Sequence, residues 1–132
     1  MIDFATSPQS TLGVEWEIAL IDRESGALTQ RASEVLSILR ERHPELLEPA
    51  SDRAHVTGEF LENTVEVVTG ICRTVAEACR QLQDLADTLR DITDDLGIEF
   101  YPAGTHPFSH WADQPVVAKE RYQRVVERAQ YW

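Results

Sequence analysis

Two glutamates two residues apart form the first pattern in this sequence that suits a chemical task. Glu15 and Glu17 lie in the otherwise apolar segment 11–21. On a β-strand, residues i and i+2 point to the same face and stand about 6.5 Å apart along the chain. Carboxylates on one face repel each other, whereas their oxygens suit a shared or adjacent hard cation. The alternative is that both belong to the hydrated face of a half-buried strand.

A second acidic set follows in the segment 55–69, at Glu59, Glu62 and Glu66. If this segment forms one unbroken strand, Glu62 and Glu66 share a face. Glu59 then points the other way, unless Gly58 introduces a bulge. Two acidic strands in one small chain favour a metal site more than either strand alone, with a hydrated face as the alternative for each.

The other reactive side chains limit which metal and which type of reaction the sequence predicts. His106 and His110 are four residues apart, but Pro107 argues against one helical face, and the sequence has no His/Cys cluster of the zinc type. Oxygen ligands favour Mg²⁺ or Mn²⁺, which beside clustered carboxylates typically serve phosphoryl transfer from ATP. The sequence has no Gly-rich phosphate loop and no Ser-His-Asp or Cys-His set, so a nucleotide must be held by other means.

The segments that carry these residues are predicted to be strands and helices in alternation. Strands are expected over residues 11–21, 55–69 and 98–104, with a short return strand after the turn at 22–26. Helices are expected over residues 33–42, 74–96 and from 117 to the chain end. This order predicts an α+β fold with a mostly antiparallel sheet and helices packed on one side. A doubly wound parallel sheet is the alternative.

The helix over 74–96 has the strongest periodicity in the chain. Its apolar seam consists of Val75, Ala78, Leu82, Leu85, Leu89, Ile92 and Leu96. Thr74 and Glu77 have capping-box spacing at the start, and Gly97 occupies the position that follows a helix end. The seam either packs on the sheet of its own domain or forms a coiled-coil surface for a partner.

The length and charge of the chain exclude several classes of protein. Its 132 residues fit one domain, and 12 basic against 23 acidic residues give a formal net charge of −11. That balance argues against a sequence-independent nucleic-acid binder and against docking on an anionic membrane. With no signal peptide or membrane span visible, a cytoplasmic protein is expected. Cys72 and Cys79 would be too far apart on a helix to form a disulfide, which fits a reducing compartment.

Four segments, in the same order, carry a more specific pattern. They are residues 12–17 (LGVEWE), 59–69 (EFLENTVEVVT), 103–108 (AGTHPF) and 120–122 (ERY). They resemble the G-x-E-x-E segment, the second acidic strand, the G-T-H-P-F loop and the E-R-Y helix start of the glutamate–cysteine ligase type 2 family of carboxylate-amine ligases. The resemblance spans nearly the whole chain and implies a partial glutamine-synthetase-like catalytic domain. Family members are much longer, so residues 1–132 are expected to be an N-terminal portion, inactive alone, with residues 1–10 as a loose arm.

The resemblance implies the ATP-dependent joining of the glutamate γ-carboxylate to the amine of cysteine through an acyl phosphate. Mg²⁺ or Mn²⁺ would be the cofactor and ATP a co-substrate. Carried over by position, the metal ligands would be Glu15, Glu17, Glu59 and Glu66. His106 would lie near the metal–phosphate or substrate site, and Arg121 would position a substrate or stabilise the fold. Glu62 matches the motif without an assigned role.

Association between copies of the chain is also expected. An open sheet edge and uncovered apolar surface favour a homodimer or higher oligomer. The alternative function is a non-catalytic interaction module that self-associates through the seam over residues 75–96.

Overall fold

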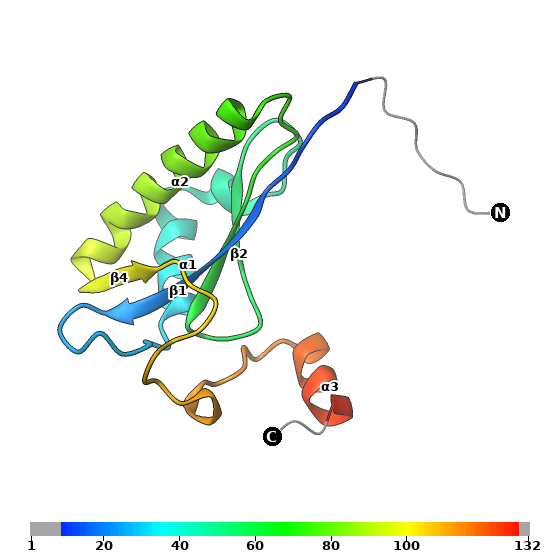
Figure 1. The fold of residues 1–132 in the computed structure, drawn as a ribbon. Helices are drawn as coiled ribbons and strands as arrows, with labels where there is room; N and C mark the ends of the chain where they lie inside the picture. The colour runs from blue at the N-terminus through cyan, green and yellow to red at the C-terminus, as the bar shows by residue number, and fades with distance from the viewer. Residues whose placement is uncertain (1–8, 130–132) are drawn as a thin grey trace.

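Four antiparallel strands form one sheet in the order β2-β3-β1-β4 (Figure 1). The computed structural model describes residues 9–129, so the arm expected over residues 1–10 lies almost wholly outside the described residues. The strands are β1 (Glu15–Asp22), β2 (His55–Gly58), β3 (Thr64–Val68) and β4 (Ile98–Tyr101). The helices are α1 (Ala32–Arg42), α2 (Val75–Asp95) and α3 (Glu120–Ala129), with 3-10 turns η1 (Pro44–Leu47) and η2 (Trp111–Asp113). The α+β prediction is confirmed, and the doubly wound alternative is wrong because each strand pairing is antiparallel.

One face of the sheet is covered by helices and the other is open. Along β1, Ile18 and Leu20 are fully buried, whereas Glu15 and Glu17 are exposed. Both α1 and α2 lie against the apolar face, as predicted (Figure 1). The core joins sheet residues to helix residues, namely Ile18, Leu20, Val56, Val65, Val67 and Ile98 with Val35, Leu39, Leu85, Leu89 and Ile92. The alternation of period two along β1 therefore decides which side chains stay on the open face.

The seam of α2 packs on the sheet of its own domain. Leu85, Leu89 and Ile92 are at most 3% exposed, so they are not available as a surface for a second chain. Thr74 caps the helix by accepting a hydrogen bond from the Glu77 backbone N–H at 3.1 Å. Val75, at 69% exposure, is the one predicted seam residue that lies off the core. The structure thus removes the basis for a module that self-associates through this seam.

The segment 55–69 is not one long strand, which corrects the sequence prediction. It forms the hairpin β2–β3, and residues 59–63 make the turn between the strands. The turn is held from outside the hairpin, because the Glu62 backbone N–H donates to the Pro115 carbonyl at 3.0 Å. Gly58 ends β2 instead of forming a bulge, and a Cβ there would stand 3.0 Å from Leu36 Cδ1. Close packing on α1 therefore explains the glycine.

Smaller corrections concern the element ends. No return strand follows the turn at 22–26, where a single bridge joins Ile21 to Leu28. The strand predicted to 104 ends at Tyr101, where Pro102 has no N–H to continue the ladder. The last helix begins at Glu120, and its predicted continuation to 132 lies outside the described residues.

The two cysteines also differ from the sequence prediction. Cys72 lies before α2, not within it, and its backbone forms a two-way bridge with Leu12. Its side chain is buried, whereas Cys79 on α2 is exposed, and both are free thiols. Among residues 9–129, each helix is too short or too polar to cross a lipid bilayer.

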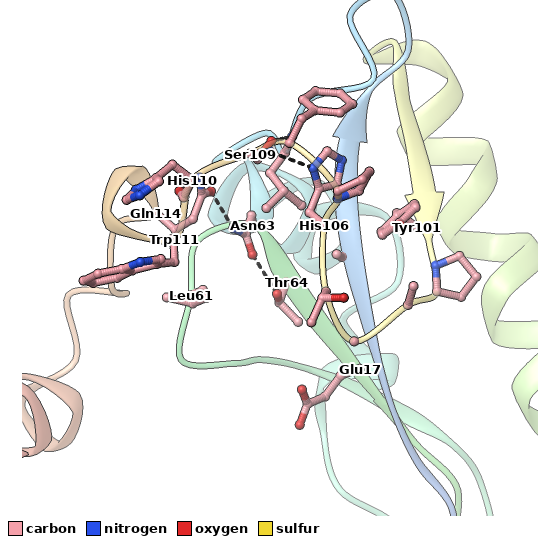
Figure 2. Close-up of a pocket in the computed structure, with 18 of the residues that line it drawn as sticks. Glu17, Leu61, Asn63, Thr64, Tyr101, His106, Ser109, His110, Trp111 and Gln114 are labelled. Atoms are coloured by element: carbon pink, nitrogen blue, oxygen red, sulfur yellow. Dashed lines mark hydrogen bonds between the residues drawn. The ribbon is translucent and has the colours of Figure 1, made fainter. Parts of the chain in front are cut away.

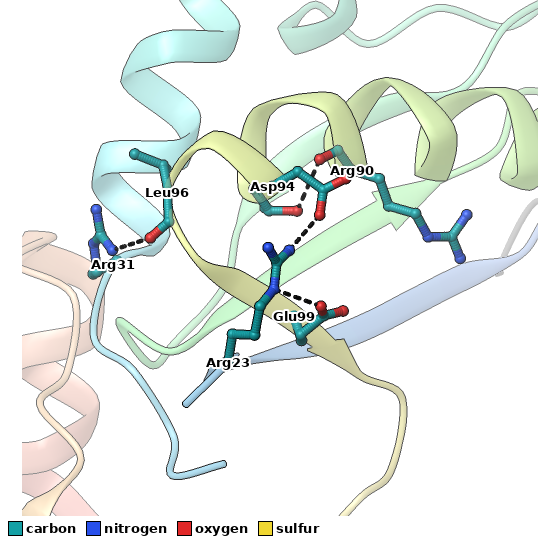
Figure 3. Close-up of polar contacts among 7 residues, drawn as sticks. Arg23, Arg31, Arg90, Asp94, Leu96 and Glu99 are labelled. Atoms are coloured by element: carbon teal, nitrogen blue, oxygen red, sulfur yellow. Dashed lines mark hydrogen bonds and ion pairs between the residues drawn. The ribbon is translucent and has the colours of Figure 1, made fainter. Parts of the chain in front are cut away.

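Arg23 ties three elements together at the far end of β1 (Figure 3). Its Nε donates to Glu99 on β4 at 2.7 Å, and its other guanidinium nitrogen pairs with Asp94 at the end of α2. Its backbone N–H donates to the Gly97 carbonyl at 2.9 Å. Gly97 has φ +67°, which favours glycine at this helix end. The network ties the end of β1 to the connection between α2 and β4.

Candidate metal and substrate site

Three of the predicted carboxylates lie on the open face of the sheet. Glu17 is paired directly with Glu66 across the β1–β3 ladder, and Glu15 lies two residues before Glu17 on the same face. Thr57 on β2 is paired with Glu66 from the other side. Directly opposed like charges destabilise a sheet, so this row has an electrostatic cost when no cation is bound. The shared face of Glu15 and Glu17 is as the spacing predicted.

Glu66 is the electrostatic centre of this group. Burial raises the pKa of its carboxyl group, and the charges of Glu59, Glu15 and Glu17 raise it further. Arg121 is the counter-charge that lowers the same pKa. Glu59 lies directly after β2 and joins the group without sharing a strand with Glu66. The four glutamates and the arginine singled out in the sequence therefore act on one another in the fold.

The donor set of these glutamates suits a hard cation, because it consists of carboxylate oxygens alone. A divalent cation would also remove the repulsion that raises the pKa of Glu66. Over residues 9–129, no three His, Cys, Asp or Glu side chains converge closely enough to enclose a metal ion as they stand. The four glutamates thus have the charge and the ligand atoms that a hard cation prefers. Their assignment as metal ligands stays a prediction.

Arg121 is held beside the carboxylates by its neighbour Tyr122. One guanidinium nitrogen donates to the Tyr122 hydroxyl, and the guanidinium carbon lies 4.4 Å from the centre of the Tyr122 ring. Tyr122 is buried and packs edge-on against Phe60 at 5.3 Å between ring centres. The hydrogen bond to Tyr122 raises the pKa of Arg121, with further contributions from Glu59 and Glu66. Tyr122 thus anchors α3 and orients the arginine.

His106 occupies a different place, in the loop after β4. Its Nδ1 accepts the Ser109 backbone N–H at 3.0 Å, so its Nε2 carries the proton donated to the Gly26 carbonyl, also at 3.0 Å. Its ring contacts Tyr101 and Phe108 edge-on, with centres 5.1 and 4.6 Å away. Both ring nitrogens therefore hold the loop in shape. The fold brings His106 to the wall of a pocket that Glu17 also lines. It does not place His106 among the clustered side chains of Glu15, Glu17, Glu59 and Glu66.

This pocket has a volume of about 750 Å³ and lies between the open face and the loop over residues 101–114 (Figure 2). We call it the aromatic pocket, defined by Trp16, Glu17, Tyr101, His106, Phe108 and Trp111 together with the amides Asn63 and Gln114. Figure 2 shows Glu17 at the sheet-side margin and Trp111 at the opposite side.

Two buried amides that the sequence did not single out brace the aromatic pocket. Asn63 Nδ2 donates to Gln114 Oε1 at 2.7 Å, and Gln114 Nε2 donates to the His110 carbonyl at 2.9 Å. Both side chains are at least nine-tenths buried. Asn63 lies inside one of the four motif segments, but nothing in the sequence indicates its partner 51 residues away.

Glu62 is the other residue whose role the sequence left open. Its Oε1 accepts the Ser33 hydroxyl at 2.9 Å and its Oε2 the Ser33 backbone N–H at 3.3 Å. Its backbone carbonyl accepts the Ala32 N–H at 2.9 Å. Glu62 therefore caps the first turn of α1, where free backbone N–H groups and the helix dipole favour a carboxylate. Both carboxylate oxygens of Glu62 are therefore used in contacts that stabilise the fold.

Comparison with known sequences decides the family. The model of glutamate-cysteine ligase family 2 (GCS2) matches residues 11–132. The chain belongs to this family. Similar curated relatives include proteins from Corynebacterium efficiens, 47% identical over 131 residues, and from Arthrobacter sp., 49% identical over 131 residues. Both carry the provisional name glutamate–cysteine ligase 2-1.

The shared region is a part of each relative. The alignments cover 99% of this chain but 32% and 34% of those two relatives. A third relative, from a Nocardioides species, is 40% identical over 131 residues, which is 33% of its length. The chain thus spans about a third of the length of the curated GCS2 relatives it matches.

Membership of the GCS2 family gives the four motif segments one structural context. The first supplies the start of β1 with Glu15 and Glu17, and the second supplies the turn after β2 and strand β3 with Glu66. The third builds the wall of the aromatic pocket around His106, and the fourth starts α3 with Arg121. Residues of the first, second and fourth segments therefore interact electrostatically around Glu66, and the third segment lines a pocket together with Glu17 of the first.

Proposed function

We propose that this chain provides the metal- and carboxylate-handling part of an ATP-dependent ligase that joins the γ-carboxylate of glutamate to the amine of cysteine. The observation that carries the proposal is the group of glutamates around Glu66, with Arg121 as the counter-charge that acts on it. Membership of the GCS2 family and the names of the relatives support a carboxylate–amine ligase. ATP and free cysteine as substrates fit a cytoplasmic setting.

The acidic and basic residues of the site have different proposed roles. Glu15, Glu17, Glu59 and Glu66 would hold Mg²⁺ or Mn²⁺, which when bound neutralises charge on the phosphates of ATP. Arg121, fixed by Tyr122, would stabilise negative charge that develops on the transferred phosphoryl group. His106 acts as a positioning residue, because its two ring nitrogens are used to hold the loop.

The proposed reaction needs no nucleophile from the protein. A γ-carboxylate oxygen of glutamate attacks the terminal phosphorus of ATP, which forms the acyl phosphate and releases ADP. The amine nitrogen then attacks the carbonyl carbon, the C–N bond forms, and the C–O bond to phosphate breaks. This division agrees with a site that offers carboxylates and an arginine but no Ser-His-Asp or Cys-His set.

Cation binding by the folded chain tests this proposal. A ligand that binds only the folded state raises the free energy of unfolding, by about 2.7 kcal/mol at a hundred times its dissociation constant. We expect saturating Mg²⁺ to stabilise the chain and the double variant Glu15→Gln/Glu17→Gln to lose that gain. Glu24→Gln, an exposed glutamate in the turn after β1, is the matched control and should respond like the wild type. Undiminished stabilisation of the double variant by Mg²⁺ would overturn the ligand assignment.

A further inference from the structure

The aromatic pocket is larger and more apolar than cysteine requires. Its volume of about 750 Å³ falls in the range of about 300–1,000 Å³ of pockets that bury drug-sized ligands. Phe108 and Trp111 at its rim are 64% and 56% exposed. Large aromatic side chains left open to water beside a cavity are typical of ligand sites. A ligand with a ring would cover both.

The charge of the aromatic pocket selects the kind of group it attracts. Within the described part of the chain, its lining contains Glu17 and no lysine or arginine. A carboxylate margin repels phosphates and carboxylates and attracts an ammonium group. The lining also contains the aromatic side chains of Tyr101 and Trp111, and aromatic rings attract the same group by cation–π interaction. The pocket is therefore suited to an amine and unsuited to the phosphates of a nucleotide.

The position of the pocket connects it with the ligase chemistry. Glu17 lines the pocket and is also paired with Glu66 in the carboxylate group. An amine held at the Glu17 margin would therefore lie next to the place where the acyl phosphate of glutamate is proposed to form. The hydrogen bonds of His106 and the Asn63–Gln114 pair keep the walls in place before a ligand arrives, which lowers the entropic cost of binding.

We propose that the aromatic pocket binds the amine co-substrate and admits, beside cysteine, amines that carry an aromatic ring, which it binds more tightly than cysteine. This rests on the proposed ligase function for its catalytic meaning. The amine nitrogen, after losing its ammonium proton to solvent, attacks the carbonyl carbon of the acyl phosphate. The C–N bond forms, the C–O bond to phosphate breaks, and the second nitrogen proton leaves with inorganic phosphate.

Calorimetric titration of the 132-residue chain tests the binding step without ATP or metal. The probes are 2-phenylethylamine, cysteine, 3-phenylpropionate and adenosine. We expect 2-phenylethylamine to bind at least about twofold more tightly than cysteine, since one aromatic contact contributes about 0.5–1.5 kcal/mol, a factor of about 2 to 12. The anion 3-phenylpropionate should bind more weakly than the amine. Equal or tighter binding of cysteine, or tighter binding of adenosine, would overturn the proposal.

Variants show where 2-phenylethylamine binds and separate the contribution of the aromatic rings from that of the Glu17 charge. Phe108→Ala and Trp111→Ala should each weaken 2-phenylethylamine by a factor of about 2 to 12, whereas Val75→Ala, an exposed apolar residue on α2, should leave it unchanged. Glu17→Gln should weaken the binding of 2-phenylethylamine and leave the binding of 3-phenylpropionate no weaker. Unchanged amine affinity in both aromatic variants contradicts the proposal. A wild-type chain that binds the amine as expected but is not stabilised by Mg²⁺ would instead count against the ligase function alone.

Discussion

Glu66 lies where burial and three other carboxylates act against its charge. Its raised pKa means that the folded chain holds this proton more readily than the unfolded chain. The ionised form therefore lowers stability at neutral pH. That cost disappears as the pH falls through the raised folded pKa to below the unfolded value of about 4.3.

Replacing Glu66 by glutamine should therefore stabilise the metal-free chain at neutral pH. We expect a gain of about 0.5 kcal/mol, the size of a cross-strand charge effect, and a smaller gain at about pH 4. Urea denaturation in the presence of a chelator measures both. The exposed Glu24→Gln variant controls for the change in net charge. A loss of stability on Glu66→Gln at neutral pH would contradict the view that burial and the neighbouring carboxylates disfavour the ionised form of Glu66.

The residues of the carboxylate group differ in how far the sequence could predict them. Glu15 and Glu17 follow from strand periodicity alone, because each strand residue alternates faces. The convergence of Glu59 and Arg121 on Glu66 depends on how a hairpin and a distant helix meet, which no local pattern encodes. The pairing of Asn63 with Gln114 could not be predicted from local sequence either, because the two buried amides lie 51 residues apart in the chain.

The turn between β2 and β3 is joined to α1 by the carboxylate of Glu62. Glu62→Ala removes the acceptor of the Ser33 N–H and hydroxyl, so we expect a loss of about 1 kcal/mol in the free energy of unfolding. Glu62→Gln keeps one acceptor oxygen and should lose less than Glu62→Ala. Denaturation of the three proteins side by side measures this order. A Glu62→Ala variant as stable as the wild type would contradict the capping role.

The seam of α2 provides a second prediction at this scale. Leu89 is fully buried against the sheet, so Leu89→Ala should destabilise the chain by about 3 kcal/mol through lost burial and the cavity left behind. Val75 lies on the same helix but is 69% exposed, and Val75→Ala should change stability by less than about 0.5 kcal/mol. Thermal unfolding of both variants checks the contrast, and equal effects would contradict the observed packing.

Helix α2 and the segment 55–69 show why prediction succeeded for one element and not for the other. Six turns of apolar periodicity with a cap at Thr74 and a glycine at position 97 form a local signal that only a helix satisfies. The segment 55–69 has strand-like composition throughout, and its break comes from contacts made far along the chain, with Ser33 and Pro115. Tertiary contacts outweighed β-propensity there.

At the scale of the whole molecule, two edges of the sheet remain. β2 and β4 are the outer strands of the four, and β4 pairs with β1 over Ala19–Asp22 only. Outer strands with unpaired backbone groups favour association, so we expect a dimer or larger species in solution. Sedimentation velocity over a range of concentrations measures this, and a monomer at all concentrations would contradict the expectation.

The carboxylate face makes the same association sensitive to charge. Copies that meet through the open face would bring two sets of glutamates together, so association by that route should strengthen with salt, which screens the repulsion. Association through an outer strand away from the glutamates should respond less. The salt dependence of the sedimentation profile therefore distinguishes the two routes.

The most direct test of the proposed metal site is to locate a bound cation on the sheet. Mn²⁺ broadens the nuclear magnetic resonance signals of nearby amides, so a titration monitored by ¹H–¹⁵N spectra locates the ion without relying on turnover. We expect signals of Glu15, Glu17 and Glu66 to broaden first, and Glu66→Gln to reduce the effect. Broadening that begins instead at the acidic end of α2, around Asp94 and Asp95, would contradict a metal site among the glutamates of the open face.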